Sequence, residues 1–234
     1  MTTHKTKAGL WNLALAFSLL GILAGCSTDG PETIRREPPK AAPALQPMEV
    51  EMLQVAAKGD NARVKELLDK GVNVNVRGYD RNTPIMEAAY GMHLDTVKLL
   101  LDHGADLSAK KNDGATPATL ARSEDIVRLF KNVTSLVDAA RNGNNQAVKD
   151  VIDKGTPVNG LDQSGLSALT EASWNGKTET VKLLLERGAD PTIKKSDGET
   201  PLSLATGQKH EAIVVLLNQA IAKRSGASSS PAAK

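Results

Sequence analysis

The chain has a single cysteine and few aromatic residues. Its 234 residues include one Cys, two Trp, two Tyr and two Phe. Because one cysteine cannot form a disulfide within the chain, burial of apolar side chains must hold the fold together. Apolar residues make up 40% of the sequence, which is enough to supply such a core.

The chain also lacks an excess of charge of either sign. It has 29 Lys and Arg against 27 Asp and Glu. Lys5 and Lys7 belong to the leader described below, and without them the basic residues number 27, equal to the acidic ones. No run of like charges is longer than two residues. This balance argues against a nucleic-acid-binding surface and against a polybasic membrane patch.

A hydrophobic run long enough to span a membrane is missing near the start of the chain. The apolar run at residues 10–23 is shorter than the roughly 20 residues that a membrane-spanning helix needs. Lys5 and Lys7 precede it, and small residues lead from it to Cys26. This order of charged, apolar and small residues is typical of a secretory signal.

The end of this leader, Leu23-Ala24-Gly25-Cys26, resembles the lipobox of bacterial lipoproteins. The resemblance implies a signal peptide at residues 1–25, cleavage before Cys26, and diacylation of the Cys26 sulfur, which would anchor the protein on a membrane. Ser27 follows the cysteine instead of the Asp that favours the inner membrane in enteric bacteria, so the outer membrane, facing the periplasm, is favoured. An ordinary signal peptide or an N-terminal membrane anchor is the alternative.

Residues 26–48 then form a proline-rich tether behind the lipid. Such a stretch favours extended conformations, with a reach of roughly 65 Å at about 3.1 Å per residue. The prolines that interrupt it are Pro31, Pro38, Pro39, Pro43 and Pro47.

Two later stretches repeat one another. Residues 83–117 and 167–201 share an Ala-rich pair or its Ala-Ser equivalent, the string Thr-Val-Lys-Leu-Leu-Leu, the triplet Gly-Ala-Asp, and a closing Asp-Gly-x-Thr-Pro. The spacing from Gly71 to Gly104 recurs from Gly155 to Gly188. This period of about 33 residues, with these motifs, resembles the ankyrin repeat, and the resemblance covers about residues 49–222. It implies an all-α solenoid of helix-turn-helix units with short hairpin loops.

The spacing has a physical basis that does not depend on the family. Thr83 is placed to cap a helix with its hydroxyl, and Pro84 suits the first helical position. Ala88 and Ala89 keep this first helix thin, so that a neighbouring unit can approach closely. In the second helix, apolar residues such as Val97 recur at helical spacing.

We count six units, at about residues 49–77, 78–110, 111–132, 133–161, 162–194 and 195–223. Thr116 and Thr200 are as far apart in the sequence as Gly59 and Gly143, so two triplets of units are joined by the shortened third unit. We predict a tight junction near Lys131-Asn132 that breaks the regular stacking, with Phe130 filling the seam. The repeat domain is expected at residues 49–223 and a disordered tail at 224–234.

No constellation of residues points to catalysis. His93 and His210 fall at matching positions of two units, which favours a structural role, and His103 precedes a glycine at the end of a second helix. Metal-binding, nucleophile-elbow and phosphate-loop motifs are absent from the sequence. We therefore expect no enzyme activity, no cofactor and no metal.

In ankyrin repeats, partners usually contact the hairpin tips and the inner face of the first helices. The position after the Ala-Ala pair, which projects into this groove, holds Ala57, Tyr90, Arg141 and Trp174 in four of the units. Tyr, Trp and Arg are enriched at binding hot spots. The alternative is that Tyr90 and Trp174 merely pad the first helix against its neighbour. The predicted partner-binding residues are Tyr79, Asp80, Asn82, Tyr90, Arg141, Gln163, Ser164, Leu166, Trp174 and Asn175.

The sequence therefore predicts a lipid-anchored periplasmic ankyrin-repeat protein that binds another protein and not nucleic acid. We expect a monomer attached to the membrane through the lipid on Cys26. Two narrower roles stay open. One is an immunity or inhibitor protein that neutralises a toxin or effector enzyme, and the other is an accessory factor that supports a periplasmic stress-defence enzyme.

Overall fold

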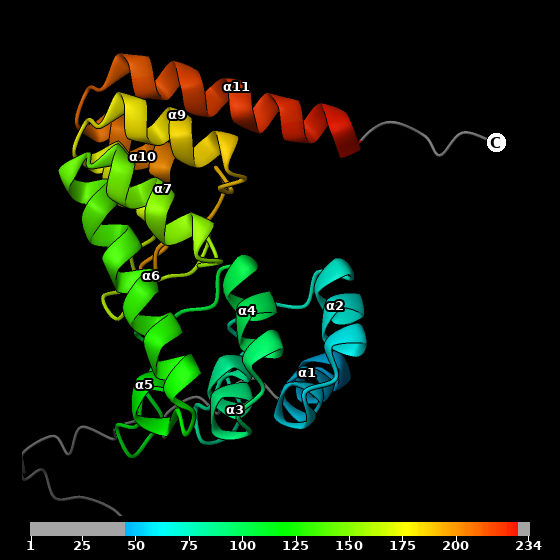
Figure 1. Ribbon diagram of the computed structural model, residues 1–234. Coiled ribbons are helices and arrows are strands. Elements are labelled where there is room, and N and C mark those ends of the chain that lie inside the picture. Colours follow the sequence, from blue (N-terminus) through cyan, green and yellow to red (C-terminus); the bar gives the residue numbers. More distant parts are fainter. Residues whose placement is uncertain (1–44, 229–234) are drawn as a thin grey trace, which may run out of the picture. The chain divides into compact units, whose positions relative to one another are not determined.

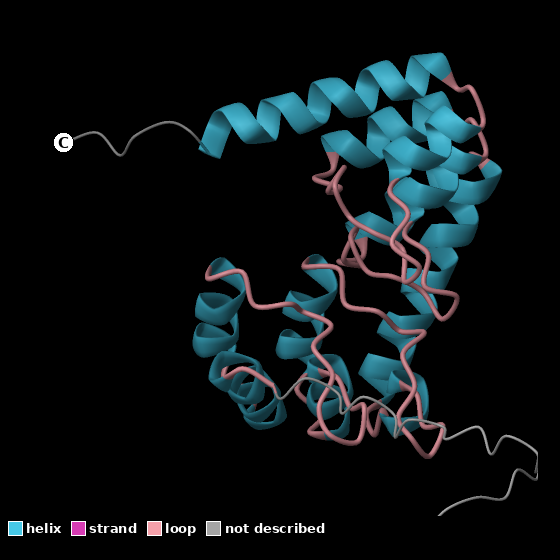
Figure 2. Cartoon of the chain, turned by 180° about the vertical axis from the view of Figure 1, so that it is seen from behind, coloured by secondary structure: helices cyan, strands magenta, loops and turns pink. Residues whose placement is uncertain are grey.

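The computed structural model describes residues 45–228 (Figure 1). The predicted signal peptide, Cys26 and most of the tether lie outside the described residues, as does the segment 229–234. Figure 2 shows helices joined by loops, with no strand in the described part. The helices are α1 (Pro47–Lys58), α2 (Asn61–Asp69), α3 (Pro84–Tyr90), α4 (Leu94–Asp102), α5 (Pro117–Leu120), α6 (Glu124–Asn142), α7 (Asn145–Asp153), α8 (Ala168–Trp174), α9 (Thr178–Glu186), α10 (Pro201–Gly207) and α11 (Glu211–Ser228).

The helices form two layers, as a helical solenoid requires. The first helices of successive units pack side by side, α1 on α3 and α3 on α5, and later α6 on α8 and α8 on α10. The second helices do the same, α2 on α4, and later α7 on α9 and α9 on α11. The predicted all-α solenoid of helix-turn-helix units is confirmed.

Four of the first helices follow a Thr or Ser residue, and in three of them the hydroxyl of that residue caps the helix as predicted. The hydroxyls of Thr116, Ser167 and Thr200 accept a hydrogen bond from the backbone N–H three residues later. In each case that later residue is Thr or Ser, and its own hydroxyl accepts a hydrogen bond from the cap N–H. The prediction that Thr83 caps α3 with its hydroxyl is wrong. Met86 stands at the third position, its N–H is bonded to the Thr83 carbonyl, and Thr83 Oγ1 has no partner in residues 45–228.

The turn between the two helices of a unit contains a residue with a left-handed backbone, as the fifth and second units show. Gly176 has φ +68°, and a Cβ there would lie 2.7 Å from the His210 ring of the next unit. Met92 occupies the same place in the second unit at φ 62°, although left-handed backbone is costly for any residue with a Cβ. The unit after Met92 is the shortened one, in which Ser123 stands directly before the second helix, where the sixth unit has the larger His210.

The junction between the two triplets is a helix. We predicted a tight junction near Lys131-Asn132, but α6 runs unbroken through it. The physical reason is that residues 124–142 contain no glycine or proline and place apolar residues at helical spacing. The second helix of the third unit therefore continues directly into the first helix of the fourth.

Helix α6 is shared by two apolar clusters. Phe130, which is 1% exposed, and Val133 belong to the cluster of the first triplet, whereas Leu136 and Ala140 belong to that of the second. Phe130 is thus buried next to the boundary, at the place where it was expected to fill the seam. The backbone is continuous across this boundary.

The loops bridge the gap that the shortened unit leaves. The Leu107 N–H donates to the Leu161 carbonyl at 3.1 Å, and the Leu161 N–H donates to the Ala105 carbonyl at 3.1 Å. The Asn159 side chain donates to the Asp102 carbonyl at 2.9 Å and accepts from the backbone N–H of the fifth unit's Asp190 at 2.8 Å. The loop of the second unit is therefore bonded directly to the loop of the fourth unit, on the side where the third unit is shortened.

A network of ion pairs joins the two helices of the first unit. Arg63 on α2 donates to both carboxylate oxygens of Glu51 on α1, at 2.7 and 2.9 Å, and also contacts Glu66. Lys70 donates to Glu66 at 2.6 Å. Hydrogen bonds from Lys70 and Arg63 lower the pKa of Glu66 to about 2. This polar network suits a unit at the end of a stack, where one face has no neighbouring unit.

The repeat region extends slightly beyond its predicted limits. Helix α1 begins at Pro47, before the expected residue 49, and α11 continues past residue 223 to Ser228. The expectation of disorder from residue 224 is therefore wrong for residues 224–228. Good helix formers such as Lys223 continue the helix, and Arg224 lies 3.2 Å from the Asp190 carboxylate.

Candidate partner-binding groove

The predicted residues of the second unit's hairpin lie at its tip but are partly used within the chain. Tyr79 is 99% exposed. The Asp80 carboxylate lies 3.5 Å from Lys111 Nζ, and Asn82 donates to Glu87. Of these three residues, Tyr79 is the most open to a partner.

Tyr90, on the first helix of the second unit, contacts a cation of its own chain. The ring is 56% exposed, and the guanidinium carbon of Arg122 lies 5.0 Å from the ring centroid. This distance is within the range of a cation–π interaction. Arg122 of the next unit covers part of the ring. This contact agrees with the alternative that Tyr90 packs the first helix against its neighbour.

The hairpin of the fifth unit is organised by a buried carboxylate. Asp162 Oδ1 accepts hydrogen bonds from the Ser164 N–H at 2.8 Å and the Leu166 N–H at 3.0 Å. Burial of this carboxyl raises its pKa, although the two backbone hydrogen bonds and the charge of Arg141 oppose the shift. Gln163 and Ser164 are exposed at the tip, while Leu166 is half-buried.

Three predicted residues line one depression on the first-helix side of the second triplet. They are Arg141 at the end of α6, Trp174 at the end of α8, and Asn175, which follows it. The depression has a volume of about 370 Å³. Its other lining residues are Glu171, Lys195, Glu199 and Leu204. We call this seven-residue surface the Trp174 pocket.

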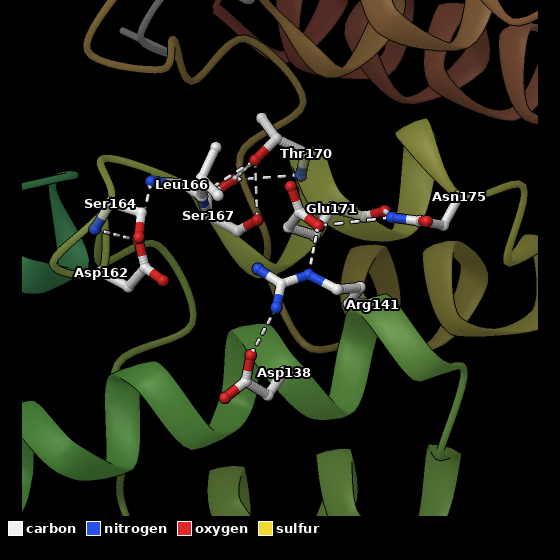
Figure 3. Close-up of polar contacts among 9 residues, drawn as sticks. All are labelled: Asp138, Arg141, Asp162, Ser164, Leu166, Ser167, Thr170, Glu171 and Asn175. Carbon is white, nitrogen blue, oxygen red and sulfur yellow. Dashed lines mark hydrogen bonds and ion pairs between the residues drawn. The ribbon is translucent and has the colours of Figure 1, made fainter.

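The wall of the Trp174 pocket is an ion-pair network that joins two units. Figure 3 shows the Arg141 guanidinium lying between Asp138 of its own helix and Glu171 of α8. Arg141 Nε donates to Glu171 at 2.7 Å, and Nη1 donates to Asp138 at 2.8 Å. Asn175 Nδ2 also donates to Glu171 Oε2, at 3.3 Å. The hydrogen bond to Glu171 raises the pKa of Arg141, so Arg141 stays charged and is paired with two carboxylates.

The other charged lining residues come from the hairpin of the sixth unit. Lys195 Nζ lies 2.7 Å from the Glu199 carboxylate and 3.0 Å from that of Asp197. The hydrogen bond to Glu199 raises the pKa of Lys195. Lys195 is therefore paired with two carboxylates, as Arg141 is.

The backbone of Trp174 is bonded to the next unit. Its carbonyl accepts a hydrogen bond from His210 Nε2 at 3.1 Å. His93 makes the equivalent bond to the Ala57 carbonyl at 3.0 Å. Both histidines thus join successive units through the backbone, which is the structural role expected for them. The Trp174 side chain is 46% exposed.

Sequence reasoning missed four of the seven residues of the Trp174 pocket. Lys195 and Glu199 occupy the hairpin of the sixth unit, where the same rule about hairpin tips could have found them. Glu171 and Leu204 precede the pair of small residues on their helices. The Glu171 carboxylate is bonded to Arg141, which belongs to a different helix, α6. The sequence around Glu171 alone therefore could not indicate its place in the pocket.

Within 45–228, no three His, Cys, Asp or Glu side chains are grouped so that they could hold a metal ion. In the same range, no helix combines the length and the apolar character needed to cross a bilayer.

Paired helices stacked side by side in two layers define a helical-repeat solenoid. The family described as "Ankyrin repeats (3 copies)" matches residues 52–134 and again residues 136–225. The chain belongs to the ankyrin repeat family. The two matches separate at the boundary between the two apolar clusters, in agreement with two triplets. Ankyrin repeats mediate protein–protein interaction, and the fold is typically a non-catalytic module.

Individual relatives are similar over the repeats. The chain is 39% identical over 74 residues to a 2-5A-dependent ribonuclease of Mus musculus, which is 30% of this chain and 10% of that protein. It is 30% identical over 126 residues to a putative ankyrin repeat protein of fowlpox virus, 48% of this chain and 17% of the other. It is 42% identical over 59 residues to ankyrin repeat domain-containing protein 49 of Bos taurus, 25% of each. The chain thus spans a quarter or less of the length of each of these relatives.

Proposed function

We propose that this chain is a lipid-anchored protein of a bacterial cell envelope that binds another protein through the Trp174 pocket. It masks or positions that partner close to the membrane on which the lipid sits. The observation that supports this function best is the grouping of Arg141, Trp174 and Asn175 around one depression. The residues come from two different first helices and lie where ankyrin repeats present their contact surface.

The character of the pocket supports contact with a protein. Tryptophan and arginine are enriched among residues that contribute most to binding. The ion pairs hold the walls in place before a partner arrives, which reduces the entropy lost on binding.

Site-specific photo-crosslinking tests the location of the interface. A photo-reactive residue at position 175 lies beside the pocket, whereas the same residue at position 186 lies at the exposed end of α9, outside it. In envelope extract we expect one protein to be crosslinked from position 175 and not from position 186, and to be lost when Trp174→Ala is added. Equal crosslinking from both positions would refute the proposed interface.

The anchor is a separate part of the proposal. The sequence Leu23-Ala24-Gly25-Cys26 supports lipid attachment at Cys26 and a periplasmic location, with the outer membrane favoured. We expect cells given a radiolabelled fatty acid to label the wild-type chain and not Cys26→Ser. Membrane fractionation of the labelled chain then distinguishes the two membranes, and a labelled Cys26→Ser variant would contradict the lipobox.

A further inference from the structure

The internal duplication offers a comparison within one molecule. Tyr90 and Trp174 occupy equivalent positions in the two triplets. In the first triplet, Arg122 covers the Tyr90 ring. The residue equivalent to Arg122 in the second triplet is Thr206, which has no charge and whose hydroxyl donates to the Leu202 carbonyl. Among residues 45–228, no cation of the chain lies over the Trp174 ring.

The charges around Trp174 favour a cation in that place. Each of the two pocket cations is paired with two carboxylates: Arg141 with Asp138 and Glu171, and Lys195 with Asp197 and Glu199. Glu171 and Glu199 line the pocket, and Asp138 and Asp197 are bonded to its two cations, so four negative charges accompany two positive ones. Three of the four carboxylate side chains, those of Asp138, Asp197 and Glu199, are at least half exposed, so they are open to a further donor.

We propose that the Trp174 pocket receives an arginine side chain of the protein partner, which stacks its guanidinium on the indole and donates hydrogen bonds to the surrounding carboxylates. This inference rests on the proposed function, because it names the chemistry of the partner at the same site. Tryptophan is the best aromatic acceptor of a cation. Arginine is preferred over lysine because its planar fork both stacks on rings and pairs with carboxylates at two points.

A peptide titration tests this assignment on the full chain. Trp174 is the sole tryptophan once residues 1–25 are removed, and Trp11→Phe gives the same result in an unprocessed chain, so the emission reports on the pocket alone. The probes are blocked pentapeptides of glycine with two arginines, with two citrullines, which keep the shape without the charge, or with two glutamates. We expect a saturable change of emission with the arginine peptide, at least tenfold weaker binding of the citrulline peptide, and no binding of the glutamate peptide. Equal binding of the arginine and citrulline peptides, or no response to arginine, would overturn the proposal.

Matched variants place the binding at the pocket. Asp138→Asn combined with Glu199→Gln removes two exposed charges but leaves Arg141 bonded to Glu171 and Lys195 paired with Asp197. We expect this variant to bind the arginine peptide at least tenfold more weakly, whereas Glu186→Gln, outside the pocket, leaves binding unchanged. An unchanged affinity in the double variant would also overturn the proposal.

Three further outcomes separate the competing explanations. The predicted tether contains two adjacent arginines, Arg35 and Arg36. If Arg35→Ala with Arg36→Ala strengthens arginine-peptide binding tenfold or more, this pair occupies the pocket and the assignment to a partner is overturned. If position 175 still crosslinks a protein in a Trp174-dependent way while the arginine peptide fails, only the arginine assignment falls. If the crosslink is also absent, the proposed function falls with it.

Discussion

A proline at position 132 should break the helix that joins the two triplets. Asn132 lies in the interior of α6, next to buried Val133 and close to buried Phe130. A proline there removes one N–H donor of the helix and clashes with the preceding turn, which costs about 3 kcal/mol or more. Asn132→Ala is the matched control, because it removes the same side chain and improves helix propensity by up to about 0.7 kcal/mol.

Chemical and thermal unfolding, followed by circular dichroism, measure the difference between the two variants. For a domain of this size we expect the proline variant to melt roughly 6–12 °C below the alanine variant, at about 2–4 °C per kcal/mol. Because α6 contributes to both apolar clusters, the proline variant should also separate the unfolding of the two triplets. A proline variant within about 1 kcal/mol of the alanine variant would show that the junction is a turn and would refute the continuous helix.

Three other predictions follow from the fold. Met92→Gly should stabilise the protein by about 1 kcal/mol because it relieves a left-handed backbone, whereas Gly176→Ala should destabilise it because a Cβ meets His210; thermal unfolding compares them. Phe130→Ala should cost about 3–5 kcal/mol by opening a cavity in the core, which a urea titration measures. Folding lowers the pKa of Glu66 from 4.5 to about 2, so its stabilisation is present above pH 4.5 and is lost as the pH falls toward 2. The stabilities of wild type and Glu66→Gln, from urea titrations across this range, should therefore differ near neutral pH and converge near pH 2.

The repeating part of the fold was predictable because its causes are local. Caps such as Thr200, small residues such as Ala88, and the glycines that end second helices act within one unit, so their regular spacing marks each unit. The fused helix α6 was not predicted, although the absence of glycine and proline in 124–142 was a visible signal. The short length of the third unit suggested a break in the stack of helices. A helix nevertheless continues where apolar residues keep helical spacing and no glycine or proline interrupts them.

The bond between the loops of the second and fourth units could not be predicted from the repeat. Leu107 and Leu161 belong to units that are not consecutive, and their pairing follows only from the way in which the shortened unit is closed. The same holds for the candidate site. Trp174 and Arg141 were assigned to the groove by position, but Arg141 is paired with two carboxylates that only the folded chain brings to it.

The affinity of the crosslinked partner for Trp174→Ala tests the central claim most directly, namely that contact at the Trp174 pocket is the function of this chain. We predict that the variant keeps the helical content of the wild type and binds the purified partner about 2 kcal/mol more weakly or worse, which is roughly 30-fold in Kd. An unchanged Kd in a fully folded variant would contradict the account.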